Sequence, residues 1–272
     1  MRSLARRGPH RVLRGDLAFA GIPGVLYTPE SGFGLPGVAF GHDWLTGADH
    51  YTATLEHLAS WGVVAAAPNT GLGPAPSVLD LGHNLAVTLD VISGVRLGPG
   101  RISVSPDRLG LAGHGLGASA AVFAAAERPQ VARAGAAVFP SVTRPSAEAV
   151  AARLTAPGLV LATPKDATSL RTDALEVARA WDGSVLRVVK KADAAGLAEK
   201  RRLRRMLGIA GSNTRTQRTV RALLTGFLLF HLTGDKTYRA FADADAALPR
   251  TEKPDPDAPP VTAEDRIVAL FR

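Results

Sequence analysis

Short apolar runs alternate along this chain with longer segments of helical periodicity. The predicted strands, in chain order, are Val12–Ala20, Gly24–Tyr27, Gly37–Phe40, Gly62–Ala67, Arg108–Ala112, Ala136–Phe139, Gly158–Ala162 and Ser184–Val189. The predicted helices are Ala48–Trp61, Ser77–Ser93, Leu116–Ala126, Ala147–Leu154, Ala167–Trp181, Ala198–Leu207 and Thr214–Leu232. Such alternation is typical of βαβ units, so we expect an α/β fold with a mainly parallel central sheet flanked by helices.

The pattern changes near the C-terminus. Pro249–Pro260 is rich in proline and charge, which indicates a linker, and Thr262–Phe271 has the spacing of a short terminal helix. We therefore expect one domain over residues 1–248 and a tail over 249–272. Within the domain, Val104–Asp107 is predicted to be a turn, because a proline lies inside it.

Length and composition narrow the class of protein. The chain has 272 residues, of which 46% are hydrophobic and 21% charged, and these globular values exclude wholesale disorder. It has no cysteine, which excludes disulfides, thiolate metal sites and a cysteine nucleophile.

The N-terminus has five arginines before its first acid, Asp16, but no apolar stretch of signal-peptide length follows. No apolar run approaches the roughly 20 residues that a membrane-spanning helix needs. We therefore expect a soluble, cytoplasmic protein.

The net charge of +8 is unevenly distributed. The densest basic patch consists of Lys200, Arg201, Arg202, Arg204 and Arg205. It suits an acidic protein partner, an anionic small ligand or peripheral contact with an anionic membrane, and a merely solvated helix face is the alternative. Aromatic residues are absent from the whole stretch Glu199–Ala222, which argues against binding of single-stranded nucleic acid.

A glycine-rich corner joins a buried strand to the Ala-rich helix. It reads Gly113-His-Gly-Leu-Gly117 and has the strand–turn–helix setting of the G-x-S-x-G nucleophile elbow. Its central residue is Gly115, where an esterase needs serine, cysteine or aspartate. The corner is therefore predicted without a nucleophile.

Five other segments, before and after this corner in the chain, add to the pattern through their order and spacing. They are Gly37–Trp44, Leu58–Val64, Ser105–Gly110, Leu159–Asp166 and Leu223–Asp243. Together, over about Arg11 to Asp245, they resemble the α/β-hydrolase family, in particular its actinobacterial polyester-hydrolase and dienelactone-hydrolase members. The resemblance implies that Asp166 is the catalytic acid and that the base falls at Ala194, within the loop Lys190–Leu197.

Two of the three implied catalytic positions thus lack a functional side chain. We expect a catalytically silent protein, a pseudo-hydrolase acting by ligand binding or protein–protein interaction. The alternative is an active ester hydrolase with a displaced nucleophile, either Ser119 or a water activated by Asp166 or His114. Ser119 is expected to lie down the helix, and His114 to be a packed structural residue.

The resemblance also implies backbone oxyanion donors at His42 and Leu116, which could hold a carbonyl or a small anion. We assign the His42 side chain a binding role and Trp44 a place in the cleft wall. The possible metal ligands His42, Asp43, His50, His114 and Asp166 lack metal-binding spacing, so no metal or cofactor is predicted. The sequence does not specify an oligomeric state.

Overall fold

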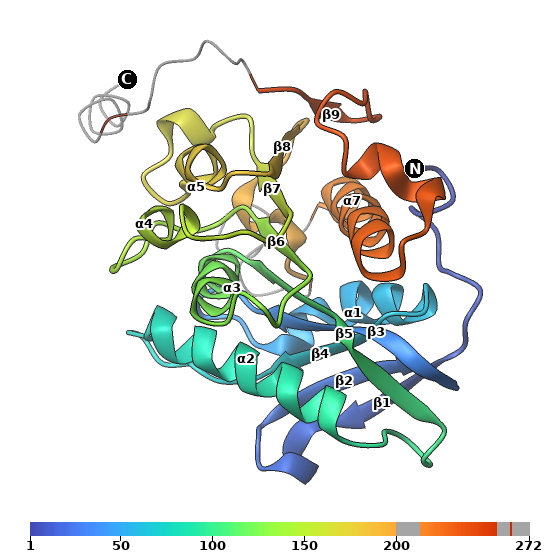
Figure 1. Ribbon diagram of the computed structural model, residues 1–272. Coiled ribbons are helices and arrows are strands. Elements are labelled where there is room, and N and C mark those ends of the chain that lie inside the picture. Colours follow the sequence, from blue (N-terminus) through green and yellow to red (C-terminus); the bar gives the residue numbers. More distant parts are fainter. Residues whose placement is uncertain (200–212, 255–261, 263–272) are drawn as a thin grey trace.

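The computed structural model describes residues 1–199, 213–254 and 262 (Figure 1). Within them, nine strands form one sheet in the order β1-β2-β4-β3-β5-β6-β7-β8-β9. The strands are β1 Val12–Asp16, β2 Gly24–Pro29, β3 Gly32–Gly41, β4 Val64–Pro68, β5 Ile102–His114, β6 Ala134–Val138, β7 Gly158–Ala162, β8 Ser184–Val189 and β9 Thr251–Glu252. All pairings from β4 to β8 are parallel, while β1, β2 and β9 pair antiparallel at the edges. The predicted α/β class with a mainly parallel sheet is confirmed.

Helices cover both faces of this sheet (Figure 1). Helices α1 and α7 share one apolar core with the sheet, and α2, α3, α4 and α5 share the other. Their bounds are α1 Thr52–Ser60, α2 Val78–Gly94, α3 Leu116–Glu127, α4 Ala147–Ala151, α5 Ala174–Ala180 and α7 Thr214–Thr233. Strand side chains alternate between the cores, as Val38, Ala39 and Phe40 of β3 show. No helix in the described part of the chain combines the length and apolarity needed to cross a membrane.

Short 3-10 turns complete the described elements: η1 Leu17–Ala20, η2 Ala48–Tyr51, η3 Asp166–Thr168, η4 Ala194–Leu197 and η5 Lys236–Phe241. The strand predicted over Val12–Ala20 is too long, because the Asp16 carboxylate accepts the N–H of Ala18 and starts η1.

Two other predicted boundaries are also wrong. The expected turn at Val104–Asp107 lies inside β5, where irregular pairing with β3 accommodates the proline. The helix predicted over Ala167–Trp181 is confined to α5. The hydroxyl of Ser169 accepts the N–H groups of Arg171 and Thr172, which diverts the backbone from helical geometry before α5.

The sheet continues past residue 248, where composition indicated the domain boundary. Thr251 and Glu252 form β9 and pair with Val189 and Val188 of β8. The predicted helix at 198–207 lies outside the described residues from 200 onward. The terminal helix predicted at 262–271 also lies outside them, apart from Thr262.

The parallel arrangement brings several loops to one edge of the sheet. Strands β3, β5, β6, β7 and β8 all end there, so the segments that follow them meet at their carboxyl ends. This edge holds every position that the family resemblance assigned to chemistry.

Candidate functional site

The corner between β5 and α3 has a backbone conformation that favours glycine. Gly115 has φ 57° and ψ −121°, a conformation that side-chain-bearing residues rarely adopt. The backbones on either side approach closely: a Cβ on Gly117 would lie 2.2 Å from the carbonyl carbon of Gly41. The corner thus packs directly against the end of β3.

The Asp43 carboxylate fills the place where a nucleophile would begin. A Cβ on Gly115 would lie only 2.0 Å from Asp43 Oδ1. The same oxygen accepts the N–H of Leu116 at 3.0 Å and that of Trp44 at 2.8 Å. The Asp43 carboxylate therefore accepts the hydrogen bonds that the amide groups at this corner would otherwise donate to a bound anion.

This geometry alters one expectation about the anion donors. Leu116 donates as expected, but the N–H beside it comes from Trp44 rather than from His42. The His42 ring is buried, with Nε2 2.8 Å from the Thr70 carbonyl and Nδ1 3.0 Å from the Asp43 carbonyl. Its observed contacts join two loops, and it is absent from the cleft lining that we assign below.

A chain of hydrogen bonds runs from the Asp43 loop to the predicted base position. The Asp43 N–H donates to Tyr51 Oη at 3.1 Å, and that hydroxyl lies 2.7 Å from His114 Nδ1. His114 Nε2 lies 2.5 Å from the carbonyl oxygen of Ala194. A carbonyl only accepts, so Nε2 carries the proton, and in the neutral ring Nδ1 then accepts from the Tyr51 hydroxyl. His114 is fully buried and links β5 to η4 and η2.

Asp166 lies in the segment after β7, as expected for the acid position, but it contacts another element. Its Oδ2 accepts the N–H of Leu175 at 3.2 Å, at the start of α5. The residue is 1% exposed and does not line the cleft that contains Gly115 and Ala194. The structure therefore brings two of the three implied catalytic positions to one cavity and turns the third toward α5.

Ser119 is buried in α3, one turn beyond the corner. Its hydroxyl donates to the Ser141 carbonyl at 2.7 Å. Within the described residues, no three side chains of the types His, Cys, Asp and Glu cluster as metal ligands would. The five possible ligands considered above are thus not assembled into such a group.

The cleft over this corner has a volume of about 530 Å³. Gly115, Leu116 and Asp43 form one part of its wall, and Ala194 and Ala195 another. Trp44 is 49% exposed and also lines it, held by a 3.1 Å hydrogen bond from Nε1 to the Pro74 carbonyl. The remaining wall includes apolar side chains and two arginines: Phe139, Val142, Leu170, Arg144 and Arg171.

Sequence reasoning missed Asp43 as the occupant of the corner and missed the two cleft arginines. The available signal for Asp43 was its position directly after the predicted oxyanion segment, paired with a glycine at the nucleophile position. The arginines follow β6 and β7 at the same sheet edge, a placement that topology alone could have indicated.

The basic patch Lys200–Arg205 lies outside the described residues. Of the basic residues that follow it, Arg221 is already paired, because its Nη2 lies 2.8 Å from Glu199 Oε1. Burial lowers the Arg221 pKa, and the attraction of Glu199 opposes that effect. Glu199 also accepts the N–H groups of Ala53 and Thr54, so this ion pair fastens α7 to α1.

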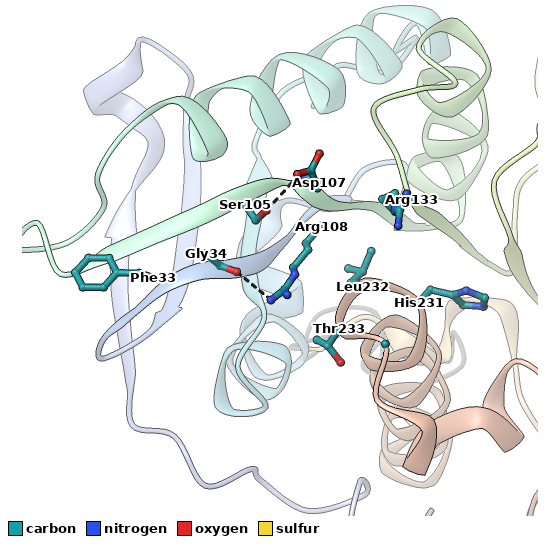
Figure 2. Close-up of a pocket in the computed structure, with 10 residues that line it drawn as sticks. Phe33, Gly34, Ser105, Asp107, Arg108, Arg133, His231, Leu232 and Thr233 are labelled. Carbon is teal, nitrogen blue, oxygen red and sulfur yellow. Dashed lines mark hydrogen bonds between the residues drawn. The ribbon is translucent and has the colours of Figure 1, made fainter.

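A second cavity, of about 610 Å³, lies at the opposite end of β5 (Figure 2). It is lined by Ser105, Asp107 and Arg108 of that strand and by the last residues of α7. Figure 2 shows Arg108 extending to the Gly34 carbonyl, which accepts its hydrogen bond at 3.3 Å. Since Gly115 follows the other end of β5, this cavity is separate from the cleft.

No protein-family model matches the chain, and no curated protein matches it in sequence.

Proposed function

We propose that this chain is a catalytically silent α/β-hydrolase-like protein that binds a small ligand in the cleft. The observation that carries the proposal is the Asp43 carboxylate at Gly115. It takes the space of the missing nucleophile and accepts the N–H of Leu116, the residue after the nucleophile position. An ester carbonyl placed there would meet a negative charge instead of free donors, which disfavours an oxyanion.

The cleft nevertheless offers features that suit a ligand. Its volume of about 530 Å³ is adequate for a small molecule, and Trp44, Phe139 and Leu170 give it an apolar wall. Arg144 and Arg171 provide positive charge in the same cavity. The combination favours a ligand with an apolar or aromatic body and an anionic group directed toward the arginines and away from Asp43.

The first test measures ester hydrolysis and covalent labelling of a nucleophile. Purified protein is assayed with p-nitrophenyl acetate and butyrate and is treated with a fluorophosphonate probe. We expect hydrolysis no faster than in buffer, and no labelling. Labelling that is lost in Ser119→Ala would establish an active displaced serine and overturn the proposal. The buried Ser119 hydroxyl and its hydrogen bond to Ser141 support the expected result.

The second test measures binding with 2-naphthoate, a simple aromatic carboxylate, through quenching of tryptophan fluorescence. We expect saturable quenching that Trp44→Phe removes and that Arg144→Ala/Arg171→Ala weakens. The control Arg101→Ala/Arg153→Ala removes the same charge from outside the cleft lining and should bind as the wild type does. Equal binding by both double variants would reject the cleft arginines as the anion site.

A further inference from the structure

Three segments far apart in the sequence enclose a cavity of about 810 Å³ beside α7. They are the N-terminal residues up to Arg7, the first half of α7, and the pair Pro249–Arg250 before β9. Figure 1 shows the N-terminus (blue) next to α7 and close to the red segment that leads to β9. We call this cavity the arginine pocket, since five arginines line it: Arg2, Arg6, Arg7, Arg218 and Arg250.

The arginine pocket has five cationic side chains and no ion-paired partner for them among the described residues. Its described lining contains no carboxylate, and none of the five arginines forms an ion pair with a described residue. Neighbouring arginines differ: Arg221 is paired with Glu199, and Arg187 donates to the carbonyl of Ala246. Five cations around one cavity repel each other and attract a multiply charged anion.

The backbone that carries the N-terminal arginines is held in place, while the arginine side chains themselves are exposed. Leu4 is 1% exposed and anchors the N-terminal segment in the core. The Arg6 carbonyl accepts the Trp61 Nε1–H at 3.1 Å, and the Gly8 N–H donates to Ser60 Oγ at 2.8 Å. This fixation means that a ligand has to order the arginine side chains but not the backbone of this segment.

The opposite wall is also fixed. Arg218 lies within α7, and the Arg250 carbonyl accepts the Lys190 N–H at 3.0 Å. Arg250 has φ 66°, which is uncommon for a residue with a side chain and is maintained here next to the β8–β9 pairing. The backbone of both walls is therefore set before any ligand arrives.

We propose that the arginine pocket binds a small anion that carries two or more phosphate groups. Guanidinium groups match phosphate oxygens with paired hydrogen bonds, and several of them can share one polyphosphate. The described lining has no aromatic ring on which a base could stack, so the site favours a phosphate chain or a phosphorylated non-aromatic group. This proposal is independent of the proposed function, because the pocket and the cleft share no described lining residue.

The test uses calorimetric titration of the whole chain with inorganic tripolyphosphate. We expect one saturable site whose affinity falls with added salt. The double variant Arg6→Ala/Arg218→Ala removes one guanidinium from each of two walls and should weaken binding by at least about tenfold. The control Arg14→Ala/Arg101→Ala removes equal charge elsewhere and should keep wild-type affinity. The melting temperature of each variant checks that it is folded.

Two further ligands test the source of the phosphates and the class of anion. Vesicles of phosphatidylcholine with phosphatidylinositol bisphosphate test whether a lipid headgroup supplies the phosphates. If the protein binds these vesicles and tripolyphosphate displaces it, the natural ligand is a lipid. If the protein does not bind them, the natural ligand is a soluble phosphate compound. Citrate tests the phosphate class and should bind more weakly than tripolyphosphate. No binding at millimolar tripolyphosphate, equal binding by the two double variants, or equal affinity for citrate would overturn the proposal.

Discussion

Gly115 and Asp43 are complementary at the level of single residues. One lacks a side chain in a conformation that disfavours side chains, and the other places its carboxylate oxygen 2.0 Å from where a Cβ would stand. The sequence predicted the corner and its missing nucleophile, because glycine spacing after a buried strand is a local pattern. It could not predict Asp43, since the direction of that side chain is decided by the N–H groups of Leu116 and Trp44.

Replacing Asp43 by alanine removes the acceptor for those two N–H groups. We expect Asp43→Ala to lower the free energy of unfolding by about 1–3 kcal/mol, the usual range for hydrogen bonds to a charged group at a partly buried site. Urea unfolding measures this change. Added formate should restore part of the loss by occupying the vacated place. Asp49→Ala, which removes an exposed acid nearby, should show neither the loss nor the formate effect.

Placing serine at the corner tests the same contact from the other side. We expect Gly115→Ser to destabilise the protein by at least about 1–3 kcal/mol, through the backbone conformation and the contact with Asp43. In Asp43→Ala/Gly115→Ser the contact is gone, so the double variant should lose less than the sum of the two single losses. A double-mutant cycle from urea unfolding gives the coupling; strict additivity would contradict the contact.

At the level of elements, the sequence predicted the parallel strands well and their neighbours less well. Buried parallel strands are continuous apolar runs bounded by turns, which a local pattern shows directly. The early part of β5 was missed because it contains Pro106 and polar residues, and its place in the sheet depends on pairing with β3. The shortening of α5 depends on the Ser169 hydroxyl, whose bonds no periodicity reveals.

The Tyr51 hydroxyl connects three elements, and its removal tests that connection. We expect Tyr51→Phe to cost about 1–3 kcal/mol in the free energy of unfolding, because the Asp43 N–H and His114 Nδ1 both lose a partner in a buried place. Tyr238→Phe, which changes a more exposed tyrosine, should cost little. If urea unfolding shows equal losses of stability in the two variants, the hydrogen bonds of the Tyr51 hydroxyl do not contribute the expected stability.

Across the whole molecule, two apolar cores cover the sheet, and both the N-terminal segment and residues 251–252 pack against it or extend it. The N-terminal segment packs by Leu4, and Thr251–Glu252 extend the sheet. Neither was predictable from composition, which showed only an arginine-rich start and a proline-rich end. Leu4 packs in the core that includes Leu55 and Leu58 of α1, and β9 pairs with β8 at the edge of the sheet, so both features come from tertiary contacts.

His57 lies where the N-terminal segment, α1 and α7 meet, and it links stability to pH. Burial, followed by the positive charge of Arg221, lowers its pKa from 6.5 to about 4, against a backbone hydrogen bond with Leu4. The unfolded chain therefore binds more protons between these pH values. Stability contributed by neutral His57 is complete above pH 6.5 and is lost as the pH falls toward 4.

Protonation of His57 alone lowers the free energy of unfolding by at most about 3 kcal/mol, as the size of its pKa shift implies. Urea unfolding from pH 7.5 to pH 4 measures it, and the measured slope should be smaller in His57→Gln. The matched variant His10→Gln, at a residue outside the buried set, should keep the wild-type slope. An unchanged slope in His57→Gln would contradict this account.

The contact between Asp43 and Gly115 also constrains how such a sequence can change over generations. If serine replaces Gly115 first, its side chain clashes with the Asp43 carboxylate. If a neutral residue replaces Asp43 first, the N–H groups of Leu116 and Trp44 lose their acceptor. Either order passes through a less stable protein, so a nucleophile at this corner is reached only by paired changes. Descendants of this sequence should keep Gly115 and Asp43 together or replace both.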